Sequence, residues 1–209
     1  MSSEVLIFDT ETTDLEDPVL IEASGIYITG NPLKDEQKDY FTERYNPGKP
    51  ITIEAMSKHH IIDSDLINCK PYTDFKLDPN VKYLIGHNID FDWKVIGCPD
   101  VKRIDTLAIS RYLWPDLQVH TLVGLIYFIN DDKKKARELV KNAHSSLADC
   151  WMVLDLLKVI IKLNKDKIKN WEDLYQFSEK CRIPNVMPFG KYKGELISEI
   201  PNDYKIWLL

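Results

Sequence analysis

A chain of 209 residues is long enough for one full domain and a small appendage. Its hydrophobic fraction of 44% and charged fraction of 29% are ordinary for a globular protein, which excludes disordered and fibrous chains. The formal net charge of −6 argues against a polyanionic partner, unless divalent cations neutralise clustered carboxylates in the working state. Apolar runs are too short to span a bilayer and the N-terminus shows no signal-peptide pattern, so we expect a soluble cytoplasmic protein without a membrane partner.

The first part of the chain predicts strands, because short apolar or alternating runs contain β-branched residues. These strands are expected at residues 5–8, 21–29 and 39–45. After the turn-rich residues 47–50, Thr52 is placed to cap a short helix that reaches Lys58.

Strand-to-helix units follow, and the chain then becomes mostly helical after His120. Strands are predicted at residues 82–86 and 101–104, and helices at about 90–96, 105–112, 145–163 and 171–180. Strands first and helices later indicate a mixed α/β sheet flanked by helices.

The four cysteines are scattered and show no C-x-x-C pair, so we expect reduced thiols and neither a zinc site nor a disulfide framework. They are Cys69, Cys98, Cys150 and Cys181.

Two carboxylates, Asp9 and Glu11, follow directly on the first predicted strand. Residues two apart in a strand point to the same side, so these side chains project together. Adjacent carboxylates repel each other and resist the loss of water unless a cation lies between them. A turn aspartate with an unrelated exposed glutamate explains this spacing equally well.

A second polar group, His87, Asn88, Asp90 and Asp92, follows the strand predicted at residues 82–86. One of the two aspartates can face the first pair, but residues two apart on a helix do not share a face. A helix cap at Asn88 or Asp90 explains one of these residues and leaves the others unexplained.

A third element, His144 and Asp149, flanks the start of the longest predicted helix. Ser145 is placed to cap that helix, which puts Asp149 one turn inside it and His144 on the preceding loop. An ordinary helix start with an exposed histidine explains this element when it is taken alone.

Taken in order, the three elements strongly resemble the motifs of the DEDDh (DnaQ-like) family of 3′→5′ exonucleases. D-x-E stands at Asp9 to Glu11, H-N-x-x-F-D ends at Asp92, and H-x-x-x-x-D runs from His144 to Asp149. The resemblance implies an α/β, ribonuclease H-like fold, in which helices flank a mixed five-stranded sheet and a small C-terminal extension follows.

The family mechanism implies that Asp9, Glu11, Asp92, His144 and Asp149 are catalytic and act with two Mg²⁺ ions, which Mn²⁺ can replace. By resemblance, Asp9 bridges both ions and Asp92 holds one of them. Glu11 and Asp149 hold the ion that carries the nucleophilic water. His144 acts as the general base on that water.

The resemblance also implies residues that contact the substrate. Leu15 occupies the place of an apolar side chain that meets the terminal base, although an ordinary loop leucine is an equal alternative. Asp90 takes a variable position and is expected to be solvated or to cap a helix. The expected substrate-binding residues are Thr10, Thr12, Leu15, His87 and Asn88.

Two further segments resemble the exodeoxyribonuclease X branch of this family, namely residues 103–115 and the tail from residue 189 onward. We therefore expect an exonuclease domain over residues 1–165, followed by a linker helix and a small C-terminal module over residues 166–209. Such modules usually continue beyond the position of Leu209, so a truncated module is expected.

The implied function is 3′→5′ hydrolysis of DNA, single-stranded or duplex, that releases nucleoside 5′-monophosphates during DNA repair or end processing. Relatives are often dimers, so a homodimer is one option. Two alternatives remain open: a 3′→5′ exoribonuclease that shares the motifs, and a non-catalytic nucleic-acid-binding module on the same fold. A decayed binding module is expected to lose a carboxylate or the histidine, and this chain keeps all five.

Overall fold

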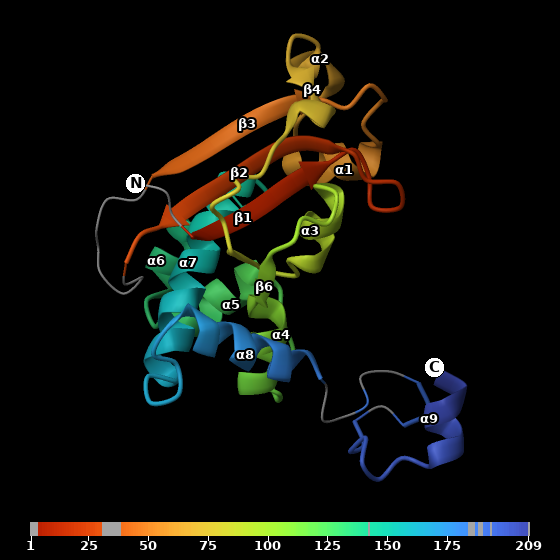
Figure 1. The fold of residues 1–209 in the computed structure, drawn as a ribbon, viewed down its shortest axis with the longest axis vertical. Helices are drawn as coiled ribbons and strands as arrows, with labels where there is room; N and C mark the ends of the chain where they lie inside the picture. The colour runs from red at the N-terminus through yellow and green to blue at the C-terminus, as the bar shows by residue number, and fades with distance from the viewer. Residues whose placement is uncertain are drawn as a thin grey trace.

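A six-stranded sheet forms the centre of the computed structural model (Figure 1). The structure describes residues 4–30, 39–141, 143–183, 187, 190–192 and 194–208. In spatial order β4-β3-β2-β1-β5-β6, the strands are β4 (Lys70–Pro71), β3 (Tyr40–Asn46), β2 (Leu20–Ile28), β1 (Val5–Thr12), β5 (Tyr83–Gly86) and β6 (Lys102–Asp105). β1, β2 and β3 are antiparallel, whereas β5 runs parallel to β1 and to β6. The mixed α/β sheet predicted from the sequence is confirmed.

The predicted number of five strands is wrong, because β4 adds a sixth strand. β4 has two residues and pairs in parallel only with Tyr45 and Asn46 at the end of β3. A strand of two residues leaves no alternating pattern in the sequence, so the pattern analysis missed it.

β1 is longer than the predicted run of four residues. Its register with β2 continues through Asp9 opposite Ser24 and Glu11 opposite Glu22. The apolar run stops at Asp9, but pairing between the two backbones does not depend on apolar side chains. The first carboxylate motif therefore lies on the strand itself.

Most of the described helices surround the sheet, whereas α9 (Asn202–Leu208) lies apart from it (Figure 1). The helices are α1 (Ile53–His59), α2 (Asp63–Leu66), α3 (Asp90–Val95), α4 (Thr106–Leu113), α5 (Leu122–Ile129), α6 (Lys133–Leu139), α7 (Ser146–Leu163), α8 (Trp171–Arg182) and α9, with a 3-10 turn at Tyr72–Asp74. The predicted cap Thr52 is confirmed, since its side chain accepts from the N–H group of Ala55, and the side chain of Asp105 caps α4 by accepting from the N–H group of Leu107. Ser145 occupies the predicted cap position of α7, but its side chain makes no capping hydrogen bond.

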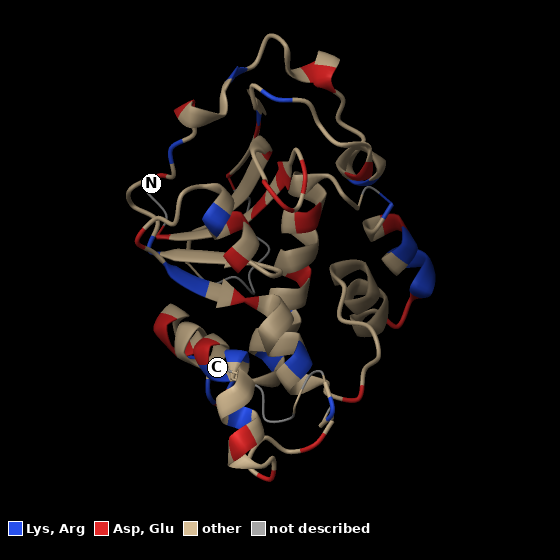
Figure 2. Ribbon diagram, turned by 90° about the vertical axis from the view of Figure 1, so that its right-hand side faces the viewer, with Lys and Arg blue, Asp and Glu red and all other residues tan. Residues whose placement is uncertain are grey.

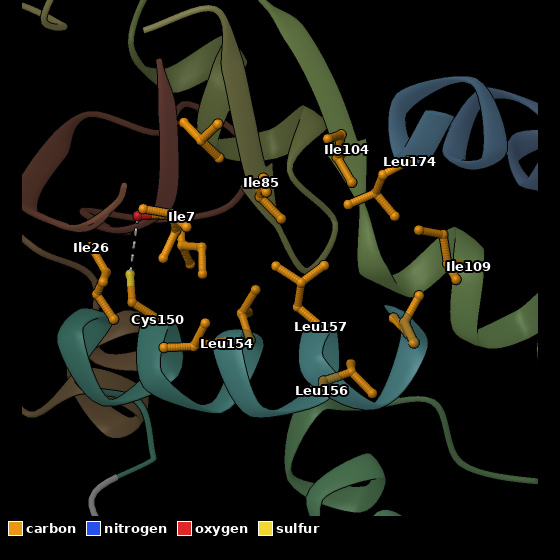
Figure 3. Close-up of a cluster of buried hydrophobic side chains, with 14 of the residues drawn as sticks. Ile7, Ile26, Ile85, Ile104, Ile109, Cys150, Leu154, Leu156, Leu157 and Leu174 are labelled. Atoms are coloured by element: carbon orange, nitrogen blue, oxygen red, sulfur yellow. Dashed lines mark hydrogen bonds between the residues drawn. The ribbon is translucent and has the colours of Figure 1, made fainter. Parts of the chain in front are cut away.

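The main core lies between the sheet and α7. Figure 3 shows Leu154 and Leu157 pointing from α7 toward the strands that carry Ile7, Ile26 and Ile85. All five side chains are buried. This packing places the first turn of α7 beside the end of β1 that carries the D-x-E motif.

α8 also belongs to this core. Leu174 is fully buried and packs in the same cluster as Ile104 of β6 and Ile109 of α4 (Figure 3). The predicted boundary after residue 165 would divide α8 from this cluster. The extent of a separate C-terminal module stays a prediction.

Gly86, at the end of β5, permits a close approach to β1. A Cβ atom at this position would lie 3.0 Å from the carbonyl oxygen of Phe8 and 2.7 Å from a side-chain carbon of Ile89. Glycine therefore brings the loop that begins with His87 close to β1.

Some sequence predictions lie outside the described residues. They concern Phe189, Lys193 and Leu209 of the tail. In the described part of the tail, the Tyr204 ring packs on Tyr192 at 4.7 Å and on Trp207 at 5.5 Å between ring centroids. Among the described helices, none has the length and apolar character needed to cross a membrane.

Candidate active site

Three carboxylates from two elements meet at the end of β1. Asp9 and Glu11 lie on the face of the sheet that α7 covers, and Asp149 projects toward them from the first turn of α7. One oxygen atom from each of the three lies within 4.8 Å of the others. The structure thus brings together side chains that are 140 positions apart in the sequence.

These carboxylates lie in an electrostatic environment that disfavours their ionised forms. Burial raises the pKa of Asp9 well above its ordinary value, and the carboxylates of Asp92 and Asp149 raise it further. Burial, followed by repulsion from Asp149, raises the pKa of Glu11 to about 9. Burial also raises the pKa of Asp149 to about 6, against the opposing effect of His144. A bound divalent cation would relieve this repulsion.

Asp92 approaches the same strand from α3. Its Oδ1 accepts a hydrogen bond from the Thr10 backbone N–H at 2.9 Å and a second from the Thr10 hydroxyl at 2.7 Å. Burial raises the pKa of Asp92 to about 7, although both Thr10 hydrogen bonds favour the charged form. Asp92 stands outside the group of three carboxylates, yet its charge raises the pKa of Asp9. This arrangement suits two neighbouring cation positions that share Asp9.

The loop before α3 is fixed by buried partners. Asn88 has a φ of 70°, and its backbone N–H donates to Oδ1 of Asp105 at 2.9 Å. His87 Nε2 lies 2.8 Å from the carbonyl oxygen of His120, and Nδ1 lies 3.1 Å from the Thr106 hydroxyl. Because the carbonyl only accepts, Nε2 carries the proton of the neutral ring. The structure therefore shows His87 and Asn88 shaping the loop that presents Asp92.

Asp90 does not have the role expected from its position. It is not a cap, and its side chain, although 37% exposed, is paired: its two oxygens accept from Arg103 Nη1 and Arg182 Nη1, each at 2.7 Å. The Arg103 guanidinium also lies 3.9 Å from the centre of the Trp93 ring. Asp90 thus ties α3 to β6 and α8.

His144 lies on the turn that precedes α7. Its backbone N–H donates to Oδ1 of Asp149 at 3.3 Å, and its side chain is exposed. With Lys141 and Trp151 it lines a cavity of about 570 Å³. Its φ of 70° lies in the left-handed region, which is uncommon for residues other than glycine and recurs at functional sites.

A second cavity, of about 490 Å³, opens beside Glu11. Leu15, which is 71% exposed, lines it, and Lys58 brings positive charge to it, whereas Lys49 in the same lining is paired with Asp14 and Asp17. Thr12 also lines the cavity, but its hydroxyl donates to the carbonyl oxygen of Asp14. The cavity adjoins the carboxylates and contains both an apolar side chain and cations.

One functional candidate was missed in the sequence. Glu22, on β2 directly opposite Glu11, is a further buried carboxylate that raises the pKa of both Asp9 and Glu11. A single glutamate in an otherwise apolar strand gave no motif. Its position within a buried strand, where an unpaired charge is costly, was the available signal.

Charged segments of both signs are interspersed over the molecule in the view of Figure 2. The lysine run at the start of α6 is exposed, and Lys133 Nζ donates to the carbonyl oxygens of Tyr127 and Asn130. The acidic site thus lies on a surface of mixed charge.

The chain is similar in sequence to known nucleases. It is 25% identical to Exodeoxyribonuclease 10 of Escherichia coli strain K12 over 218 residues, which cover 97% of this chain and 89% of that protein. It is 29% identical to the PolC-type DNA polymerase III of Pediococcus pentosaceus over 161 residues, or 69% of this chain and 10% of the polymerase. A family model described as "Putative quorum-sensing-regulated virulence factor" matches residues 180–209.

Solved structures share the fold. Exonuclease X in complex with 5′ overhanging duplex DNA has a TM-score of 0.63 and 22% identity, over 83% of this chain and 99% of that one. E. coli Exonuclease I in complex with a dA16 oligonucleotide has a TM-score of 0.59 and 16% identity, over 84% of this chain and 43% of that one.

The similarity to Exodeoxyribonuclease 10 runs along almost the whole chain, and the sheet matches that of Exonuclease X. The carboxylates of the three ordered motifs meet at one end of this sheet. The chain is therefore homologous to Exodeoxyribonuclease 10 and to PolC-type DNA polymerases, and these similarities support its resemblance to the DnaQ-like 3′→5′ exonuclease family.

Proposed function

We propose that this protein is a 3′→5′ exonuclease that hydrolyses DNA from its 3′ end with the help of two Mg²⁺ ions. The observation that carries the proposal is the group of Asp9, Glu11 and Asp149, whose oxygens lie within 4.8 Å of one another in a partly buried site. Like charges so close together are costly without a cation, and hard oxygen ligands suit Mg²⁺. Mn²⁺ takes the same ligands and is expected to substitute.

The donor set suits two ions. Asp9, Glu11 and Asp149 would hold one, and Asp9 together with Asp92 would hold the other. The ions would supply positive charge for the phosphodiester and a more acidic water molecule. Thr10 contributes by fixing Asp92 Oδ1 through two hydrogen bonds, which sets the direction of the remaining oxygen.

The chain's own side chains would complete the reaction. His144, next to Asp149, would take a proton from the attacking water on an imidazole nitrogen. The water oxygen would then bond to phosphorus as the bond from phosphorus to the 3′ oxygen of the preceding nucleotide breaks. That oxygen would take up a proton from solvent, so that a nucleoside 5′-monophosphate and a strand ending in a 3′ hydroxyl are released.

The cavity beside Glu11 is the proposed place of the terminal nucleotide. Leu15 offers an apolar contact for a base, and Lys58 offers charge for phosphate. Thr12 in the cavity, together with His87 and Asn88 beside Asp92, would contact the last nucleotides, as expected from the motifs. The E. coli relative named Exodeoxyribonuclease 10 supports DNA as the substrate, as do the DNA complexes among the structural neighbours.

Purified protein incubated with DNA labelled at its 5′ end tests this proposal. With Mg²⁺ we expect label-bearing products that shorten from the 3′ end, together with mononucleotides. EDTA and the Asp9→Ala variant should abolish both, whereas Asp131→Ala, at an exposed position, should not. If an RNA oligonucleotide of the same sequence is degraded faster than the DNA, the substrate is RNA and not DNA. If the protein releases no mononucleotides with either Mg²⁺ or Mn²⁺, the remaining interpretation is a non-catalytic nucleic-acid-binding module.

We further propose that the activity serves DNA repair or end processing in the cytoplasm. All four cysteines carry free thiols, and Cys150 is fully buried, which suits a reducing compartment. The homodimer stays a prediction that light scattering of the purified protein would decide.

A further inference from the structure

Glu22 is a buried carboxylate that the three motifs do not include. It lies on β2, is 4% exposed and stands opposite Glu11 in the register of the two strands. Directly opposite residues of an antiparallel pair point to the same face of a sheet, so Glu22 faces α7 as Glu11 does. Burial of a carboxylate beside others requires partners that compensate its charge.

Both oxygens of Glu22 have such partners. Oε1 accepts from the Ser146 hydroxyl at 2.7 Å, and Oε2 accepts from Arg44 Nε at 2.8 Å. Glu22 is also absent from the group of carboxylates whose oxygens converge, Asp9, Glu11 and Asp149. Its geometry is therefore that of a residue that holds protein groups and not that of an ion ligand.

The hydroxyl that Glu22 holds begins α7. Ser146 is the first residue of the helix, is fully buried, and its Oγ also lies 2.7 Å from Oγ of Ser24 on β2. Ser24 Oγ in turn lies 2.8 Å from Oγ1 of Thr42. Because Ser146 donates its one proton to Glu22, Ser24 can donate to Ser146 and Thr42 can donate to Ser24. Each of the three hydroxyls then donates once, and those of Ser24 and Ser146 also accept once.

This network joins the start of α7 to the sheet. Ser145 occupies the cap position without a side-chain hydrogen bond, so the start of α7 is attached to the sheet through Ser146. His144 lies two residues before Ser146, and Asp149 lies three residues after it. The bond between Ser146 and Glu22 thus adds a polar attachment of this turn to the apolar packing of α7 on the sheet.

We propose that Glu22 is a positioning residue, which fixes the first turn of α7 so that Asp149 and His144 face the β1 carboxylates. The inference rests on the proposed function, since it assigns Glu22 a role in the same metal site. Substitution of groups that orient metal ligands typically lowers metal affinity or activity by about 10-fold to 100-fold. We expect Ser146→Ala and Glu22→Gln to weaken Mn²⁺ binding by about tenfold, at the lower end of that range.

The test measures Mn²⁺ binding by calorimetry in the absence of DNA, together with kcat and KM for DNA cleavage. For both variants we expect weaker Mn²⁺ binding and a kcat reduced by about tenfold, with KM for DNA within about twofold of wild type. Thr42→Val is the matched control, since it removes a hydroxyl at the exposed end of the network and leaves Ser146 bound to Glu22. Its Mn²⁺ affinity and kcat should match those of the wild type.

Two outcomes overturn the inference for different reasons. If the wild type binds Mn²⁺ and cleaves DNA, and a folded Ser146→Ala or Glu22→Gln variant does so equally well, Glu22 has no positioning role. If the wild type neither binds Mn²⁺ nor cleaves DNA, the proposed function fails and the inference fails with it. Glu22→Gln keeps the volume of the side chain, so it serves if the alanine variant does not fold.

Discussion

Replacement of Asp149 by asparagine should stabilise the metal-free protein, although it should abolish metal binding. Burial holds the pKa of Asp149 at about 6, above its ordinary value of 3.8, so the ionised form is disfavoured in the folded state. Asparagine has nearly the same shape and keeps an oxygen that can accept from the His144 backbone N–H. The variant therefore removes the charge and leaves the packing unchanged.

The size of the effect follows from the pKa. The rise from 3.8 to about 6 is roughly two pKa units, and each unit corresponds to about 1.4 kcal/mol, so the ionised carboxylate costs at most about 3 kcal/mol. Neighbouring carboxylates titrate together with Asp149, so we expect about 1–3 kcal/mol of stabilisation. For a chain of this size, that free energy corresponds to a rise in Tm of roughly 2–10 °C.

The sign of the pH dependence gives a second check. A carboxyl group with a raised pKa binds its proton more tightly in the folded state, so the stability of the wild type falls as pH rises from 3.8 through about 6. Thermal unfolding in EDTA should show the difference between Asp149→Asn and wild type above pH 7 and lose it below pH 4. Excess Mg²⁺ should raise the Tm of the wild type much more than that of the variant. If Asp149→Asn and the wild type have equal Tm values in EDTA above pH 7, or if the variant has the lower value, the repulsion argument is refuted. Asp131→Asn, at an exposed position, is the control.

Two other substitutions separate substrate binding from metal binding. Leu15→Ala should raise KM for DNA about fivefold, as expected for the loss of about 1 kcal/mol of apolar contact, with no change in Tm because the side chain is exposed; an unchanged KM would remove Leu15 from the substrate site. Thr10→Val should lower Mg²⁺ affinity about tenfold and stability by about 1 kcal/mol, because Asp92 loses a hydroxyl donor. If calorimetry gives the Thr10→Val variant the Mg²⁺ affinity of the wild type, the Thr10 hydroxyl does not orient Asp92 for metal binding.

Local patterns were enough to predict most strands and helices of the fold. Thr52 and Asp105 cap their helices because capping depends on residues within one turn, which a sequence displays directly. The common direction of Asp9 and Glu11 likewise follows from the period of a strand. β4 escaped prediction because its two residues pair only with the end of β3.

Contacts between distant residues could not be predicted in this way. Asp90 was expected to be solvated or to cap a helix, and its pairing with Arg182, 92 positions later in the chain, was not predicted. Glu22 and Ser146 are 124 positions apart, and neither stands in a pattern that distinguishes it from other polar residues. The pairing of such groups depends on the order of the strands and on the path of α7, which no local signal encodes.

The attachment of Asp90 to Arg182 has a practical consequence for anyone who shortens this protein for crystallography or enzymology. A fragment that stopped near residue 165 would lack Leu174 and leave the apolar side chains of Ile104 and Ile109 open to water. It would also lack Arg182, so that Asp90 would keep only Arg103 of its two arginine partners. A fragment that keeps every residue through Arg182 preserves the packing of Leu174 in the core. It also preserves the ion pairs of Asp90 with Arg103 and Arg182, which hold α3.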